Sequence, residues 1–249
     1  YRCPFDKQYP DCDITCASLV NDVIDLEDPD SVAAVIVEPI GHTGGIIDPP
    51  EEYLPLLREY CDRHDVLLIF DEIITGMGRT GQMFAAQTFG VTPDLLCLGK
   101  GLSGGYAPIA ALLCRQHIAD AFWGDPESNP GFVEGHTFEG NPISSAAGLA
   151  TLSEILERDL CANVRTQGQR LRLAPAGAVD PRFHDHSAGL NALHALRATA
   201  VFGHAHRRHH NCAAQLDRLQ QRHHAALLRH LARRIDHRSG VWDDRTGGQ

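Results

Sequence analysis

The sequence lacks the features that define several large classes of protein. Its apolar runs are no longer than one β-strand, as at residues 32–37 (VAAVIV), whereas a membrane-spanning helix needs roughly 18–20 apolar residues. No basic segment followed by an apolar stretch opens the chain, so we expect no signal peptide, no membrane partner and a cytoplasmic location. The first residue is Tyr1 rather than methionine, and we expect that further sequence precedes it.

Recognisable metal-binding motifs are also missing. None of the eight cysteines is spaced as CxxC, and the cluster formed by Cys3, Cys12 and Cys16 is followed by no histidine before His42. That spacing does not suit a zinc site, so we expect no metal. Reduced and mostly buried thiols are the expectation for a protein of the cytoplasm.

Positive charge is scarce until the last 77 residues. Residues 1–172 hold 26 acidic residues against 11 Lys and Arg, a net charge of −15, whereas residues 173–249 hold 6 acidic residues against 11 Arg, a net charge of +5. The second stretch has no Lys, Glu, Tyr or Met, yet it contains 11 of the 15 His. It is either a basic appendage for nucleic acid or metal, or an out-of-frame translation of GC-rich DNA. We favour the frame error and expect no nucleic-acid partner, because aromatic residues are not interleaved with the Arg.

What residues 1–172 do contain is an alternation of apolar strands and amphipathic helices. Four apolar runs predict strands, at residues 32–37, 66–70, 94–98 and 108–114. Helices are predicted near residues 16–26, 51–64, 84–89 and 142–160. This alternation predicts an α/β fold with a mostly parallel sheet flanked by helices. The strand at residues 32–37 is apolar throughout, so we expect both of its faces to be covered.

Two polar residues stand at or just beyond the ends of predicted strands. Asp71 follows residues 66–70, and Lys100 follows residues 94–98 within the segment GKGLSGG. Ligands of open α/β sheets bind at the carboxyl ends of strands, although an acid there is often only a helix cap or a turn former. The lysine could bind phosphate or be a surface charge, but a P-loop is excluded because Leu102 follows where Ser or Thr would bind magnesium. A Lys and an Asp at strand ends are the pair that pyridoxal phosphate chemistry requires.

Four segments, in the right order, resemble landmarks of the class III aminotransferases. They are VEPI (37–40), LIFDEIITGMGRTG (68–81), PDLLCLGKGLSGG (93–105) and HTFEGNP (136–142). The resemblance covers about residues 1–172 and implies the fold of type I PLP-dependent transferases. It divides the chain into a partial cofactor-binding large domain (1–160), the start of a helix toward a small domain (161–172) and the stretch 173–249, which we predict to be frame-shifted and non-native.

The resemblance also implies a role for each residue that matches a motif. Lys100 would form the Schiff base with pyridoxal 5'-phosphate and move a proton during catalysis, and Asp71 would pair with the pyridine nitrogen. Glu38 would lie near the cofactor, and Ile74 would pack against it. Thr137 would reach the cofactor phosphate of a neighbouring subunit, which implies a homodimer with a shared active site, unless its hydroxyl only caps a turn.

Two neighbouring features are less specific. Glu72, beside the aspartate of the motif, belongs either to a structural salt bridge or to the site itself. The loop at residues 41–45 (GHTGG) looks more like the dialkylglycine decarboxylase and ω-amino acid:pyruvate branches, because ornithine-type relatives carry a second Glu close to the position of Thr43. His42 in this loop is expected to be exposed rather than to contact substrate.

The reaction that the resemblance implies is transfer of an amino group from an amine or ω-amino acid to a 2-oxo acid. A dialkylglycine decarboxylase or an aminomutase relative is an alternative, as is a truncated or frame-shifted fragment that is catalytically incompetent. The family's phosphate-binding loop and ring-stacking aromatic residue are expected upstream of residue 1. The carboxylate-binding Arg of the small domain matches nothing in residues 173–249.

Overall fold

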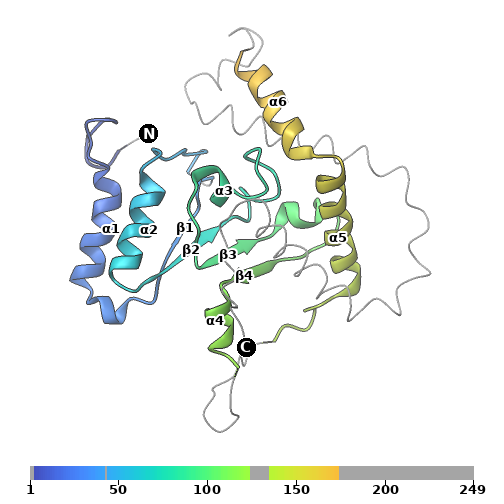
Figure 1. Cartoon of the computed structure of the whole chain (residues 1–249), viewed down its shortest axis with the longest axis horizontal. Helices are drawn as coiled ribbons and strands as arrows, with labels where there is room; N and C mark the ends of the chain where they lie inside the picture. Colours follow the sequence, from blue (N-terminus) through green and yellow to red (C-terminus); the bar gives the residue numbers. More distant parts are fainter. Residues whose placement is uncertain (1–2, 43, 124–134, 174–249) are drawn as a thin grey trace, which may run out of the picture.

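The computed structural model describes residues 3–42, 44–123 and 135–173 (Figure 1). Within them lies a four-stranded mixed sheet with the strand order β1-β2-β3-β4. Its strands are β1 (Ala34–Val37), β2 (Leu67–Asp71), β3 (Leu95–Leu98) and β4 (Ala111–Cys114). The first three are parallel, and β4 is antiparallel to β3. The predicted sheet is therefore confirmed, whereas the frame-shift prediction for residues 173–249 lies outside the described residues from 174 onward.

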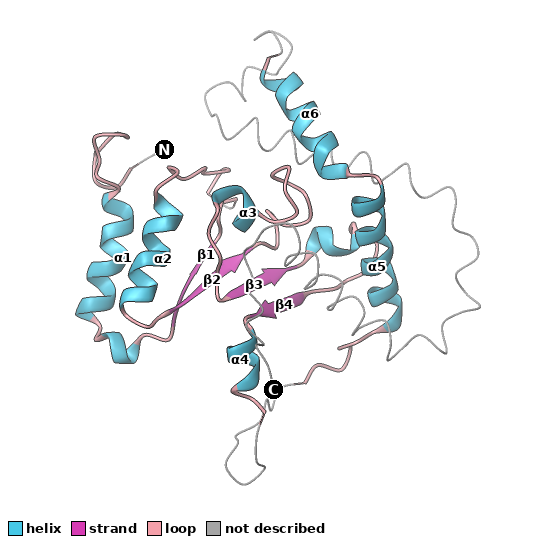
Figure 2. Ribbon diagram, viewed as in Figure 1, coloured by secondary structure: helices cyan, strands magenta, loops and turns pink. Residues whose placement is uncertain are grey.

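Helices flank this sheet and connect its strands (Figure 2). They are α1 (Thr15–Leu26), η1 (Pro29–Ser31), α2 (Tyr53–Arg63), α3 (Ala85–Phe89), η2 (Lys100–Ser103), α4 (Gln116–Asp120), α5 (Pro142–Glu157) and α6 (Leu160–Arg172). The single helix predicted at residues 142–160 ends at Glu157, because Asp159 adopts a left-handed conformation with φ of 43° and caps the next helix through Ala162 N–H. The chain thus turns between α5 and α6.

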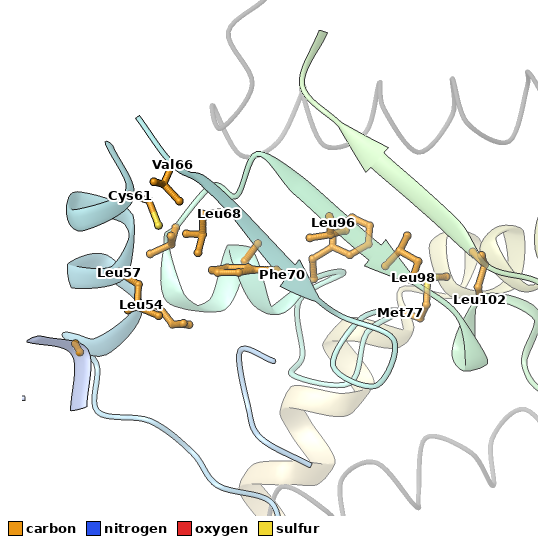
Figure 3. Packing of buried hydrophobic residues seen from close by; sticks show 14 of the residues in the cluster. Leu54, Leu57, Cys61, Val66, Leu68, Phe70, Met77, Leu96, Leu98 and Leu102 are labelled. Atoms are coloured by element: carbon orange, nitrogen blue, oxygen red, sulfur yellow. The ribbon is translucent and has the colours of Figure 1, made fainter. Parts of the chain in front are cut away.

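One face of the sheet carries the core (Figure 3). Side chains alternate along a strand, and the register places Leu68 and Phe70 of β2 on the same face as Leu96 and Leu98 of β3. All four are buried and belong to one cluster with side chains from α1, α2, α3 and α5. Each such burial stabilises the fold by roughly 1.5–3 kcal/mol, so this face fixes how the strands stack against the helices.

The opposite face is much more exposed. Ile36 of β1 is 63% exposed and Leu112 of β4 is 56% exposed. The prediction that residues 32–37 are covered on both faces is therefore wrong for the described part of the chain. The apolar run correctly indicated a strand, but Ile36 lies outside the core cluster that contains Leu68 and Phe70.

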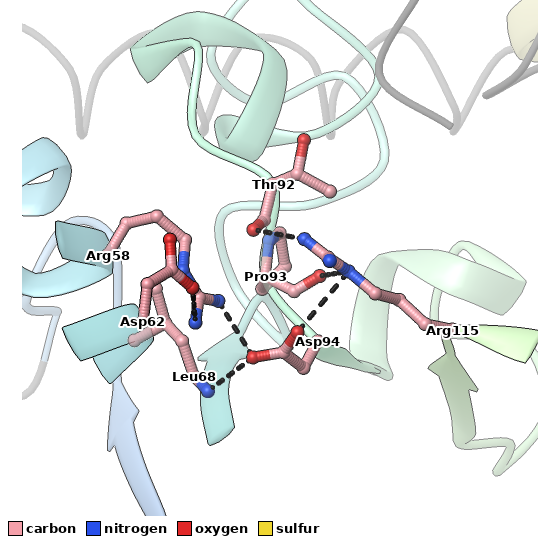
Figure 4. Close-up of polar contacts among 7 residues, drawn as sticks. All are labelled: Arg58, Asp62, Leu68, Thr92, Pro93, Asp94 and Arg115. Carbon is pink, nitrogen blue, oxygen red and sulfur yellow. Dashed lines mark hydrogen bonds and ion pairs between the residues drawn. The ribbon is translucent and has the colours of Figure 1, made fainter. Parts of the chain in front are cut away.

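A buried ion-pair network joins the amino ends of β2 and β3 to the carboxyl end of the antiparallel β4 (Figure 4). Asp94, directly before β3, accepts hydrogen bonds through Oδ2 from Arg58 Nη1 of α2 at 2.7 Å and from Leu68 N of β2 at 2.8 Å. Its Oδ1 lies 3.3 Å from Arg115 Nε, which follows β4. One carboxylate thus ties a helix and three strands at the end of the sheet where β2 and β3 begin and the antiparallel β4 finishes.

Candidate active site

Three predicted site residues lie at the same end of the sheet, where the parallel strands finish. Because β1, β2 and β3 are parallel, their carboxyl ends lie together. Asp71 is the last residue of β2 and pairs in register with Cys97 of β3. Glu38 directly follows the last residue of β1, and Lys100 comes two residues after the end of β3. Strands distant in sequence thus bring a lysine and two carboxylates to neighbouring positions.

The backbone at Lys100 has an unusual conformation. The residue opens η2 with φ of 40°, in the left-handed region that residues other than glycine seldom adopt. The loop around it is tightly packed, since a Cβ added at Gly101 would lie 3.2 Å from Met77 Cβ. The lysine side chain is exposed, and within the described residues no carboxylate oxygen lies within ion-pair distance of Nζ. The side chain of Lys100 is therefore open to solvent at this end of the sheet.

The carboxylate of Asp71 lies at the carboxyl end of β2. Oδ1 accepts a hydrogen bond from Ile73 N at 3.0 Å, and the residue is half-buried. The paired Cys97 was not singled out as a site residue in the sequence, although it stands only three residues before the lysine. Burial raises the pKa of its thiol, and the charge of Asp71 raises it further. This thiol is therefore a neutral neighbour of the carboxylate at neutral pH.

The remaining predicted site residues each have different surroundings. Glu38 accepts a hydrogen bond through Oε2 from His42 N at 3.0 Å, so its carboxylate organises the loop after β1. His42 is exposed, as expected. Ile74 is half-buried, three residues beyond Asp71. Thr137 is exposed in the turn that precedes α5, and the structure describes no hydrogen bond from it to the other predicted site residues.

Glu72 is fully buried rather than part of a salt bridge. Its carboxylate accepts hydrogen bonds from Ala85 N at 2.6 Å, Ala86 N at 2.8 Å and Thr75 Oγ1 at 3.2 Å. Burial raises the pKa of Glu72 from 4.5 to about 7, although these hydrogen bonds oppose the shift. Two roles were considered for this residue. Within the described residues Glu72 forms no salt bridge, so that prediction is wrong. Its burial also keeps the carboxylate away from the exposed end of the sheet where Asp71 and Lys100 lie.

The family model for class-III aminotransferases matches residues 2–178. The chain belongs to this family. Its sequence is 46% identical to an ω-aminotransferase of Caulobacter vibrioides over 140 residues, covering 56% of the chain and 32% of that protein. It is 43% identical to a putrescine aminotransferase of Pectobacterium atrosepticum over 169 residues, covering 67% of the chain and 35% of that protein.

Solved transaminases share the fold. An amine transaminase from an uncultivated Pseudomonas species, solved in its PLP-bound form, matches with a TM-score of 0.63 and 41% identity, over 69% of this chain and 39% of that one. The class-III aminotransferase chain described here therefore has the fold of type I PLP-dependent transaminases, and pyridoxal phosphate is the cofactor of its family. It spans about a third of the length of the curated relatives that it matches.

Two further findings concern the described residues alone. None of their helices is both long and apolar enough to cross a membrane. In the same residues, no three His, Cys, Asp or Glu side chains are grouped so that they could hold a metal ion.

Proposed function

We propose that this chain carries the lysine and aspartate of a pyridoxal phosphate site that serves transamination. The observation that supports the proposal most directly is the placement of Asp71 and Lys100 at the carboxyl ends of adjacent parallel strands. These two residues suit the cofactor, because an unpaired amine and a carboxylate at one edge can meet its aldehyde and its ring nitrogen. When bound, pyridoxal phosphate supplies an electron sink for the carbanion formed from the amino donor.

Each side chain has a distinct part in this proposal. Lys100 Nζ would hold the cofactor covalently and, once displaced by the donor, would carry a proton to and from the reacting carbon. Asp71 would keep the ring nitrogen protonated, and its hydrogen bond with Ile73 N would orient the carboxylate. Glu38 would order the loop beside the site through His42 N. The half-buried Ile74 would supply an apolar contact for the cofactor.

The relatives favour an amine or ω-amino acid as the donor and a 2-oxo acid as the acceptor. One is named an ω-aminotransferase and another a putrescine aminotransferase. The GHTGG loop at residues 41–45 agrees with this branch, since it lacks the second Glu of ornithine-type enzymes.

We assign the reaction to the cytoplasm because the seven cysteines of the described residues are all free thiols.

A second copy of the chain would complete the site. Thr137 is exposed, and so are the apolar side chains beside it, with Phe138 80% and Ile143 67% exposed. Apolar side chains at such exposure are typical of surfaces that another molecule covers. In a homodimer, the hydroxyl of Thr137 would reach the cofactor phosphate held by the partner subunit.

Covalent trapping on lysine tests the proposed function. The chain has two lysines, so Lys7→Ala is a matched control for Lys100→Ala. With pyridoxal phosphate, the unmodified chain and Lys7→Ala should show an absorbance band at about 420 nm, and borohydride should fix the label on Lys100. Lys100→Ala should show neither. Equal labelling of both lysines, or no label in folded protein, would refute the assignment.

A further inference from the structure

The two adjacent carboxylates of the motif point to opposite faces of the sheet. Successive side chains of a strand alternate between faces, so Asp71 and Glu72 cannot share one. Asp71 is half-buried at the edge where the predicted site residues lie. Glu72 is 0% exposed and reaches into the core on the other side. The buried carboxylate therefore acts on the site only through the backbone that both residues share.

The carboxylate of Glu72 fastens two segments to the end of β2. Oε2 accepts from Ala85 N at 2.6 Å and from Thr75 Oγ1 at 3.2 Å, and Oε1 accepts from Ala86 N at 2.8 Å. Ala85 and Ala86 begin α3, so the carboxylate satisfies amides at its first turn that have no partner within the helix. The start of this helix and the turn after β2 are thus held by one side chain.

The backbone of Glu72 is fixed as firmly as its side chain. Its N–H donates to Cys97 O of β3 at 3.0 Å, and its carbonyl accepts from Gly76 N at 3.0 Å. A Cβ at Gly76 would lie 2.8 Å from that carbonyl oxygen, so only glycine allows this close turn. The main-chain and carboxylate oxygens of Glu72 therefore each have a hydrogen-bond partner.

We propose that Glu72 is a positioning residue for Asp71. Between the fixed residue 72 and the fixed Gly76 lies Ile73, whose N–H donates to Asp71 Oδ1 at 3.0 Å. The amide that orients the aspartate therefore belongs to the turn that Glu72 holds from the core side. The role of Asp71 toward the cofactor nitrogen rests on the proposed function, whereas the mechanical link from Glu72 to Asp71 does not.

Hydrogen exchange at single amides of the whole chain tests this link without any cofactor. Well above pH 7, where Glu72 is ionised, exchange of the Ile73 amide in Glu72→Gln should be faster by about tenfold or more, together with Ala85 and Ala86, because one anchoring acceptor becomes a donor. Glu59→Gln on the exposed side of α2 is the matched control and should leave all three amides unchanged. Acceleration confined to Ala85 and Ala86 would show that Glu72 only anchors α3 and would overturn the proposal.

A milder variant guards against a failure of Glu72→Gln to fold. Thr75→Val keeps the shape of the side chain and removes only the hydroxyl that donates to Glu72 Oε2. It should accelerate exchange at Ile73 by a few fold, and an unchanged rate in the folded variant would also refute the link. Failure of the proposed function would be seen instead as missing pyridoxal phosphate label on Lys100 of the unmodified chain.

Discussion

Glu72 makes the stability of this fold depend on pH. Its pKa in the folded chain is about 7, against 4.5 ordinarily, so between these values the folded state keeps a proton that the unfolded state has lost. Raising the pH through this window therefore disfavours the folded state, by at most roughly 3 kcal/mol. We expect the urea midpoint of the chain to fall, relative to that of Glu72→Gln, as the pH rises from 4.5 to 7.

The comparison with Glu72→Gln isolates this one residue, because the other titrating groups are common to both chains. Unfolding followed at several pH values gives the difference in free energy directly. Below pH 4.5, and again well above 7, the difference should no longer change with pH. If the unfolding free energies of the two chains changed with pH in the same way between pH 4.5 and 7, the pKa of Glu72 would be an ordinary one.

Among the structural elements, β2, β3 and β4 depend on Asp94 for their alignment at the end of the sheet where β2 and β3 begin. Asp94→Ala would leave Leu68 N without its acceptor and would remove the carboxylate that Arg58 and Arg115 share. Breaking a buried ion pair from one side costs about 3–5 kcal/mol. We expect urea unfolding of this variant to show a loss of that order.

The control for this prediction is a second partner of the same arginine. Asp62 also pairs with Arg58, at 2.7 Å, but its side chain is 65% exposed. An exposed pair contributes about 0–1 kcal/mol, so Asp62→Ala should change the unfolding free energy little. If the two variants were equally destabilised, the buried network at Asp94 would not be what aligns the strands.

The position of each strand could be predicted from the sequence, because apolar runs bounded by glycine and acidic residues indicate strands without knowledge of their neighbours. Asp71 and Lys100 followed from their places at the ends of two such runs. The exposure of Ile36 could not be predicted, since a strand's apolar pattern does not say which of its faces finds a covering helix. The role of Glu72 was also out of reach, because its partners at Ala85 and Ala86 are thirteen and fourteen residues away.

At the scale of the whole molecule, composition and family likeness change at nearly the same place. The family model ends at residue 178, and the depletion of Lys, Glu, Tyr and Met begins at residue 173. We expect one of the other two reading frames downstream of codon 172 to encode a glycine-rich continuation that matches the small domain. Translation of the parent DNA checks this, and a failure of both frames to extend the match would contradict the frame-shift hypothesis.

The alternation at the end of β2 also limits how this region can change in length during evolution. Inserting or deleting a single residue in β2 would exchange the faces of Asp71 and Glu72. The aspartate would then point into the core, and the glutamate would face the open end of the sheet. Insertions and deletions should therefore be absent from β2 in functional relatives and confined to loops such as residues 41–47, where a change in length moves no carboxylate across the sheet.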